Sequence, residues 1–211
     1  MIVLHHLNKS RSKRIIWLLE ELGVEYRIEA YQRDAQSNLA PEALKAVHPL
    51  GKSPVIEHKG RVIAESGAIT EFLCQQYRPD MIPAADSDDY IDYLQWMHFA
   101  ESSAILPLLL KMFIDKDGAK MNMLDQYAQA EVAKVMGFFN DKAGANFLIG
   151  NTLSGADIMM SFIVDALHRS GALAFFPNLQ RYYEFLASQD LFQKADEIEA
   201  KLDTAVSMVE A

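Results

Sequence analysis

The apolar residues near the start of the chain recur with strand and helix periods in turn. Residues 2–6, Ile-Val-Leu-His-His, form a short, mostly apolar run that predicts a strand. Residues 11–22 have a helical period, and Gly23 is suited to end that helix. Residues 26–31 predict a second strand. Strand, helix and strand in succession indicate a βαβ unit, whose two strands must run parallel.

A β-hairpin is the next expected feature. Residues 55–58 and 61–64 predict two strands, and Lys59-Gly60 is suited to the turn between them. Pro54 opens the first strand, where its missing N–H breaks no ladder bond. Only about 5–6% of X–Pro bonds in folded proteins are cis, so these residues alone favour a trans Ser53–Pro54 bond.

Helices are expected on both sides of the hairpin. A short helix over residues 41–47 precedes it, and a helix over residues 66–77 follows it. Glu65 and Ser66 therefore lie where a strand passes into a helix. Free backbone N–H groups and the positive end of the helix dipole make such a junction suitable for a carboxylate ligand. A plain capped helix is the alternative interpretation of these two residues.

The rest of the chain has a helical pattern. Pro and Asp residues make residues 79–87 a linker, so we predict a first domain over residues 1–78 and an all-helical domain over residues 88–211. Pro107 should kink the first long helix, because proline removes a backbone bond and clashes with the preceding turn. The helices expected in this domain are 88–113, 124–140, 155–168, 177–188 and 191–209.

One of these helices should form the centre of the second domain. Residues 155–168 are apolar nearly all round, which is typical of a buried helix. Ser154 and Asp157 before and within its first turn match a capping box, with Asp in place of Glu or Gln. We therefore interpret Asp157 as structural rather than catalytic.

Composition narrows the range of partners. The 211 residues carry a formal net charge of −9, which argues against nucleic acid or an anionic membrane as the main partner. The single cysteine, Cys74, excludes an intrachain disulfide and a cysteine-based zinc site, and the histidines lack ligand spacing, so we expect no metal. We also expect no secretory signal and no membrane-spanning run, and hence a cytoplasmic protein.

Four motifs stand out along this order of elements. They are Ser10-Arg11-Ser12-Lys13-Arg14, His48-Pro49-Leu50-Gly51-Lys52-Ser53-Pro54-Val55, Glu65-Ser66-Gly67-Ala68-Ile69, and Phe147-Leu148-Ile149-Gly150 with Ser154-Gly155-Ala156-Asp157. In this order and spacing they resemble the cytosolic glutathione S-transferases over essentially the whole chain, and most of all the bacterial and fungal branch that keeps serine in the first motif. The resemblance implies an α/β thioredoxin-like N-terminal domain (βαβ-ββα) followed by an all-α C-terminal domain.

The resemblance makes Ser10 the expected catalytic residue. A serine cannot form a mixed disulfide, so the reactive sulfur must belong to glutathione, and a hydroxyl donor beside it would stabilise thiolate over thiol. A free thiol with a pKa near 8.5 is only a few per cent ionised at neutral pH, which is why such help matters. Ser12 is the competing hydroxyl, and we expect it to cap the helix instead. Arg14, four residues after Ser10, matches the serine-type members.

Four further residues are implied to bind glutathione. Glu65 would face its ammonium group, and the N–H of Ser66 would face its γ-glutamyl carboxylate. Ser53 would hold the cysteinyl backbone through its own main chain, before a proline that is cis in this family. Lys52 would approach the glycyl carboxylate or the peptide backbone, with a solvated surface lysine as the alternative.

The resemblance implies a homodimeric glutathione transferase that conjugates glutathione to a hydrophobic electrophile. A glutathione-dependent peroxidase at the same site is one alternative, and a non-catalytic interaction module with this fold is another. Glu101 lies on the apolar stripe of the helix over residues 88–113, where an unpaired carboxylate would cost several kcal/mol. It is either an ion-pair partner or a group that reaches glutathione across a dimer.

Overall fold

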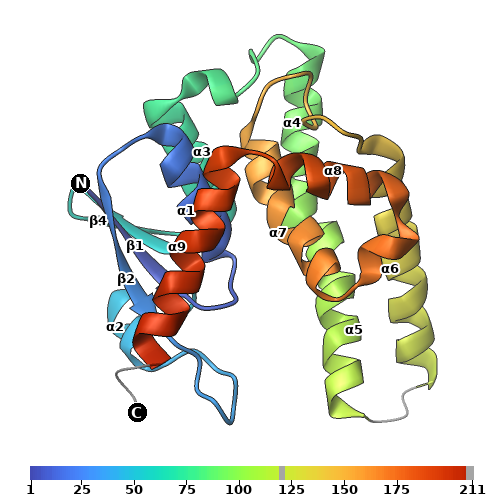
Figure 1. Cartoon of the computed structure of the whole chain (residues 1–211), viewed down its shortest axis with the longest axis horizontal. Helices are drawn as coiled ribbons and strands as arrows, with labels where there is room; N and C mark the ends of the chain where they lie inside the picture. Colours follow the sequence, from blue (N-terminus) through green and yellow to red (C-terminus); the bar gives the residue numbers. More distant parts are fainter. Residues whose placement is uncertain (119–121, 208–211) are drawn as a thin grey trace. The chain divides into compact units, whose positions relative to one another are not determined.

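The computed structural model describes residues 1–118 and 122–207 (Figure 1). The chain divides into two compact units. One unit contains Met1–Met81 together with Ala187–Ala211, and the other contains Ile82–Leu186.

The first unit is built on a four-stranded mixed sheet with the strand order β2-β1-β3-β4. The central strand β1 runs parallel to β2 and antiparallel to β3, and β3 and β4 form the expected hairpin. Lys59 and Gly60 both have positive φ, of 49° and 77°, as the tight turn of a twisted hairpin requires. The strands are β1 (Ile2–Leu7), β2 (Tyr26–Tyr31), β3 (Val55–His58) and β4 (Arg61–Ala64).

The helices of this unit confirm the expected βαβ and ββα order. Helix α1 buries Ile15, Leu18 and Leu19 completely, which is the apolar face that the sequence predicts. The Ser53–Pro54 bond is cis, as the resemblance implies and contrary to the general preference of X–Pro bonds. The helices are α1 (Ser12–Leu22), α2 (Ala43–Val47), α3 (Ser66–Tyr77) and the short 3₁₀ helix η1 (Pro79–Met81).

The last helix of the chain, α9 (Asp190–Ser207), packs against α1 and therefore belongs to the first unit (Figure 1). Phe192 meets Trp17 edge to face, with ring centroids 5.0 Å apart. Lys194 pairs with Glu20 at 2.6 Å. The predicted domain boundaries assign this helix to the second domain, and they stay a prediction, because packing in the folded state does not establish which segments fold together. Residues 208 and 209 of the expected last helix lie outside the described residues.

The second unit is helical throughout its regular structure. Helix α7 is its centre, as predicted, since 11 of its 15 residues are buried. The helices are α4 (Asp88–Phe99), the π-helical turn η2 (Ala100–Ala104), α5 (Ile105–Asp117), α6 (Asn122–Lys142), α7 (Gly155–Arg169), η3 (Ala172–Phe175) and α8 (Pro177–Ala187).

The expected kink in the first long helix takes the form of a π-helical turn. The turn η2 separates α4 from α5 and ends three residues before Pro107, which itself lies within regular helix. Pro107 offers no N–H to the carbonyl of Ser103, four residues earlier, and its ring crowds that carbonyl. One wider turn ahead of the proline accommodates both effects, which is why the irregularity lies upstream of it.

One stretch in the second unit is long and apolar enough, by length and composition alone, to cross a membrane. It is the 30-residue run Asp88–Asp117, in which a window of mean hydropathy 1.3 is one-third buried. The sequence analysis expects no membrane-spanning run, and a single stretch of this kind is weak evidence for one. Core helices of soluble proteins can be as long and as apolar, and this stretch packs against α6 and α7 of its own unit.

The start of α7 is held by the buried carboxylate of Asp157. Its two oxygens accept hydrogen bonds from the main-chain N–H of Leu148 (2.8 Å), the main-chain N–H of Ser154 (3.1 Å), the Ser154 hydroxyl (3.0 Å) and the Tyr182 hydroxyl (2.9 Å). Burial raises the pKa of Asp157 above its ordinary value, and these hydrogen bonds oppose the shift. The capping box is confirmed, and it also ties α7 to α8 and to the preceding loop.

Replacing Asp157 should therefore destabilise the protein severely. An Asp157→Ala variant leaves four donors inside the unit, three of them buried and one partly buried, without their acceptor, so the free energy of unfolding should fall by about 3–5 kcal/mol. Urea unfolding followed by circular dichroism measures this loss. Asp141→Ala, an exposed aspartate near the end of α6, is the matched control and should change the value by less than about 0.5 kcal/mol. Equal losses of unfolding free energy in the two variants would contradict the structural role of Asp157.

Candidate functional site

Ser10 lies in the turn between β1 and α1, with 6% of its surface exposed. Its hydroxyl oxygen accepts the main-chain N–H of Ser12 at 3.2 Å, and its carbonyl accepts the N–H of Lys13 at 3.3 Å. Ser10 therefore caps the first turn of α1. Its hydroxyl lies at the positive end of that helix, where a negative sulfur would be stabilised.

Ser12 does not cap the helix, contrary to the sequence expectation. It is the first residue of α1 and is fully buried. Its hydroxyl turns back to β1, where it lies 2.8 Å from Nδ1 of His6, 3.2 Å from the carbonyl oxygen of Leu7 and 3.3 Å from the N–H of Leu7. It also lies 2.7 Å from the hydroxyl of Ser10. Ser12 thus joins Ser10 to the central strand, and Ser10 is the more exposed of the two residues.

His6 is a buried residue that the sequence analysis did not select. Its side chain is 1% exposed, and burial lowers its pKa to about 4, against the attraction of the Asp203 carboxylate on α9. His6 is therefore neutral at physiological pH. It follows His5 directly on β1, and neighbouring residues of a strand point to opposite faces of the sheet. Nδ1 of His5 instead lies 3.0 Å from the Tyr31 hydroxyl, and Nε2 of His5 lies 2.9 Å from Oε1 of Glu57.

Ser53 contributes more than its main chain. Its hydroxyl donates to the carbonyl of His5 at 2.8 Å and accepts the N–H of Leu7 at 3.1 Å. These two groups lie at the end of β1, at and just beyond the last residue that pairs with β3. The side chain of Ser53 therefore fastens the loop before the cis proline to the same N–H that Ser12 approaches. Ser10 and Ser53 are held within one hydrogen-bonded cluster.

Glu65 and Ser66 occupy the start of α3, as predicted. Glu65 has φ 69° and ψ 114°, a conformation that is rare for a residue with a side chain and costs of order 1–3 kcal/mol. The side chain of Glu65 is exposed, while Ser66 is 4% exposed. The buried guanidinium of Arg14 on α1 donates to the Ser66 hydroxyl at 3.4 Å, which brings a cation to this helix start. Such a junction is suited to hold an ammonium and a carboxylate side by side.

Lys52 is exposed and precedes Ser53 in the chain. Within residues 1–118 and 122–207, no hydrogen bond or ion pair joins its side chain to Ser10, Glu65 or Ser66. The same part of the chain holds no group of three or more potential metal ligands. Cys74 is buried in α3, which raises the pKa of its thiol to about 12, so it is not a nucleophile at neutral pH.

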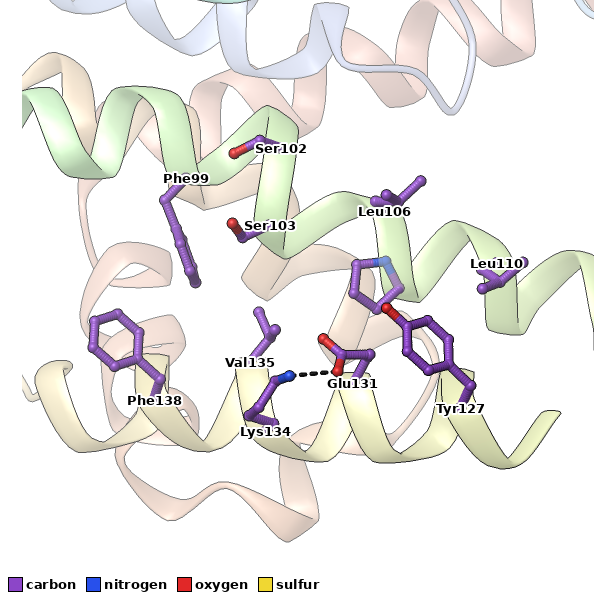
Figure 2. A pocket seen from close by; sticks show the side chains of 11 residues that line it. Phe99, Ser102, Ser103, Leu106, Leu110, Tyr127, Glu131, Lys134, Val135 and Phe138 are labelled. Carbon is purple, nitrogen blue, oxygen red and sulfur yellow. Dashed lines mark hydrogen bonds and ion pairs between the residues drawn. The ribbon is translucent and has the colours of Figure 1, made fainter. Parts of the chain in front are cut away.

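The second unit carries a separate, largely apolar groove of about 510 Å³ between the η2–α5 stretch and α6 (Figure 2). Several of its apolar side chains are exposed, with Leu106 at 65%, Tyr127 at 57% and Phe138 at 49%. Glu131 and Lys134 form an ion pair on its α6 side. Its complete lining is Phe99, Ser102, Ser103, Leu106, Pro107, Leu110, Tyr127, Glu131, Lys134, Val135 and Phe138.

Comparison with known proteins finds relatives that match most of the chain. The chain matches "Glutathione S-transferase, N-terminal domain" over residues 1–75 and "Glutathione S-transferase, C-terminal domain" over residues 106–194. It is 32% identical to glutathione S-transferase 3 of Schizosaccharomyces pombe, over 80% of this chain and 75% of the yeast protein. A solved glutathione S-transferase from Actinobacillus pleuropneumoniae is 33% identical and superposes with a TM-score of 0.85, over 95% of this chain and 93% of that one.

A second kind of relative is also similar. Elongation factor 1-gamma 3 of Oryza sativa is 27% identical over 89% of this chain, which matches 46% of that longer protein. The thioredoxin-like first domain and the helical second domain are common to the matched glutathione S-transferases, and they confirm the fold class that the sequence predicts. On these matches along most of its length, the chain belongs to the glutathione S-transferase family.

Proposed function

We propose that the protein is a glutathione transferase of the serine type, in which the Ser10 hydroxyl stabilises the thiolate of bound glutathione. The observation that carries the proposal is the position of Ser10: its hydroxyl oxygen accepts the main-chain N–H of Ser12 at the N-terminus of α1, and Ser10 is 6% exposed. The thiolate then attacks the carbon of a hydrophobic electrophile and displaces its leaving group or adds to it. The protein supplies orientation and sulfur activation.

The remaining predicted residues complete the proposed glutathione site. The exposed carboxylate of Glu65 would bind the ammonium group, and the start of α3 at Ser66 would bind the adjacent carboxylate. The main chain of Ser53 would hold the cysteinyl part, since its side chain is occupied at the end of β1. Lys52, exposed one residue earlier, would meet the glycyl carboxylate.

Removal of the Ser10 hydroxyl should raise the pKa of the bound thiol towards its free value near 8.5. A hydrogen bond to a charged group contributes about 1.5–3 kcal/mol, so kcat/KM with an aryl halide should fall about 10–100-fold in Ser10→Ala. Thiolate absorbance against pH, together with calorimetric glutathione binding, measures the shift. Ser170→Ala, at an exposed serine after α7, is the control and should match wild type. No binding by wild type at millimolar glutathione would rule out the enzyme.

Loss of the Glu65 charge should weaken glutathione binding without changing sulfur activation. In Glu65→Gln the ammonium group loses its ion-pair partner, so Kd should rise about 10–100-fold while the pKa of the bound thiol stays within about 0.3 of wild type. Calorimetry measures Kd, and thiolate absorbance against pH at saturating glutathione measures the pKa of the bound thiol. Glu71→Gln, an exposed glutamate on α3, serves as the control. An unchanged Kd in Glu65→Gln would remove Glu65 from the site.

Two other functions use the same fold. A glutathione-dependent peroxidase needs the same thiolate, which attacks a peroxide oxygen, and parallel assays with cumene hydroperoxide and an aryl halide tell which substrate is preferred. A non-catalytic interaction module is favoured by the similarity to elongation factor 1-gamma 3. It requires the fold but not the Ser10 hydroxyl, so an active protein that depends on Ser10 would exclude it.

We further propose that the protein acts as a homodimer in the cytoplasm, with small molecules rather than nucleic acid or a membrane as its ligands. Its net charge of −9 supports the choice of ligands. The exposed apolar residues along the groove of Figure 2 support a second copy as the occupant of that face, because isolated proteins rarely expose a contiguous apolar patch of this kind. Glu101, half-buried in η2 beside this face, would then approach the partner's glutathione.

A charge placed in the groove should dissociate the dimer. Phe138→Glu buries a carboxylate in an apolar interface, so light scattering after size exclusion should show twice the monomer mass for wild type and the monomer mass for the variant at micromolar concentration. Phe175→Glu, at an exposed phenylalanine of η3 that does not line the groove, controls for added charge and should remain dimeric. A monomeric wild type would refute this part of the proposal.

A further inference from the structure

Three buried side chains form a continuous hydrogen-bonded chain that ends at Ser10. Nδ1 of His6 lies 2.8 Å from the Ser12 hydroxyl, which lies 2.7 Å from the Ser10 hydroxyl. The exposed fractions are 1% for His6, 0% for Ser12 and 6% for Ser10. Ser10 is therefore the one member that a ligand can approach, and the other two act on the ligand only through it.

The direction of the protons along this chain decides what Ser10 can do. A hydroxyl donates one hydrogen bond and accepts two. If Ser12 donates to Ser10, then Ser10 accepts twice from Ser12, from its hydroxyl and from its main-chain N–H at 3.2 Å, and its own proton is left for the ligand. If Ser10 instead donates to Ser12, it offers only lone pairs to the ligand, and these repel a thiolate.

His6 selects between the two directions. When Ser12 donates to Ser10, its oxygen must accept from its other neighbours, which are the N–H of Leu7 at 3.3 Å and Nδ1 of His6. Nδ1 must then carry the proton of the neutral imidazole. The competing acceptor for the Ser12 proton, the carbonyl of Leu7, lies 3.2 Å away, farther than the 2.7 Å to Ser10.

The surroundings of His6 favour this tautomer. Nε2 of His6 is buried and has no hydrogen-bond partner among residues 1–118 and 122–207. A proton on Nε2 would be a buried donor without an acceptor, which is rarer and more costly in folded proteins than an under-satisfied acceptor. A proton on Nδ1 is satisfied by Ser12. Burial keeps the ring neutral, since the pKa of His6 is lowered to about 4.

We propose that His6 is a positioning residue for sulfur activation: it donates from Nδ1 to Ser12, which donates to Ser10, so that Ser10 in turn donates to the glutathione thiolate. The proposal rests on the proposed glutathione transferase function and on Ser10 as its activating hydroxyl. Each hydroxyl in the chain accepts and donates at once, which strengthens the final bond to the sulfur. No proton leaves this series of three hydrogen-bonded side chains, so His6 acts neither as an acid nor as a base.

The test compares a variant that removes the His6 donor with one that keeps it. In His6→Leu the pKa of bound glutathione should rise by about 1, a tenfold loss of the thiolate-to-thiol ratio, with Kd for glutathione at pH 5 changed less than about threefold. His6→Asn, whose amide can donate to Ser12, should recover most of the shift. His168→Leu, an exposed histidine on α7, is the matched control. A purely structural role would not move the thiol pKa while leaving Kd intact.

A double-mutant cycle separates this inference from the proposed function. In a Ser10→Ala background, His6→Leu should add no further shift, because the end of the chain is already lost. If wild type lowers the thiol pKa and Ser10→Ala raises it, but His6→Leu leaves it unchanged, the inference is overturned and the proposed function stands. If wild type does not bind glutathione, both are overturned.

The tautomer itself can be measured on the unaltered protein, which keeps the test available even if a His6 variant fails to fold. In ¹⁵N-histidine NMR with glutathione bound, the nitrogen shifts of His6 should identify a neutral ring protonated on Nδ1, and the spectrum should not change between pH 6 and 8. A proton on Nε2 would overturn the proposal.

Discussion

The end of β1 is the point on which the candidate site depends, because side chains complete the hydrogen bonding of this strand after its pairing with β3 has ended. The N–H of Leu7 is approached by the hydroxyls of both Ser12 and Ser53. Ser12 begins the helix whose first turn Ser10 caps, and Ser53 precedes the cis proline. A displacement of β1 would therefore move both the Ser10 hydroxyl and the Ser53 loop, which is proposed to bind the peptide backbone of glutathione. The positions of these two parts are thus fixed relative to each other.

The charged end of the site has a separate basis. Glu65 is held in a rare backbone conformation between β4 and α3, and Ser66 behind it receives a hydrogen bond from buried Arg14. Strain of this kind persists only where the surrounding structure enforces it. Here the carbonyl of Glu65 accepts the N–H of Ile69 at 2.9 Å, which fixes Glu65 to the first turn of α3. The arrangement places positive groups at one position of a chain whose net charge is −9, so a local site opposes the global charge.

The sequence predicts much of the fold and little of the hydrogen bonding. The strand and helix periods, the Lys59-Gly60 turn and the capping box at Ser154 depend on residues close in sequence, and all of these predictions are confirmed. The assignment of Ser12 as a helix cap is wrong because its hydroxyl turns to β1, a choice that depends on how the strand and the helix meet. His6 was missed because its partner Ser12 becomes a neighbour only when the turn folds back.

The chain His6–Ser12–Ser10 also bears on the choice between an enzyme and an interaction module. A module needs the packed sheet, the buried α7 and the network around Asp157, and none of these requires a histidine inside the first unit. In the described part of the chain, Nε2 of His6 is buried and has no hydrogen-bond partner. A leucine at position 6 would fill similar space and would place no such polar atom there. The buried Nε2 of the imidazole is therefore a cost that the fold alone does not explain. In the proposed mechanism, orientation of the Ser10 proton towards a thiolate is the benefit that accounts for the imidazole, and this benefit exists only when a sulfur ligand is bound there.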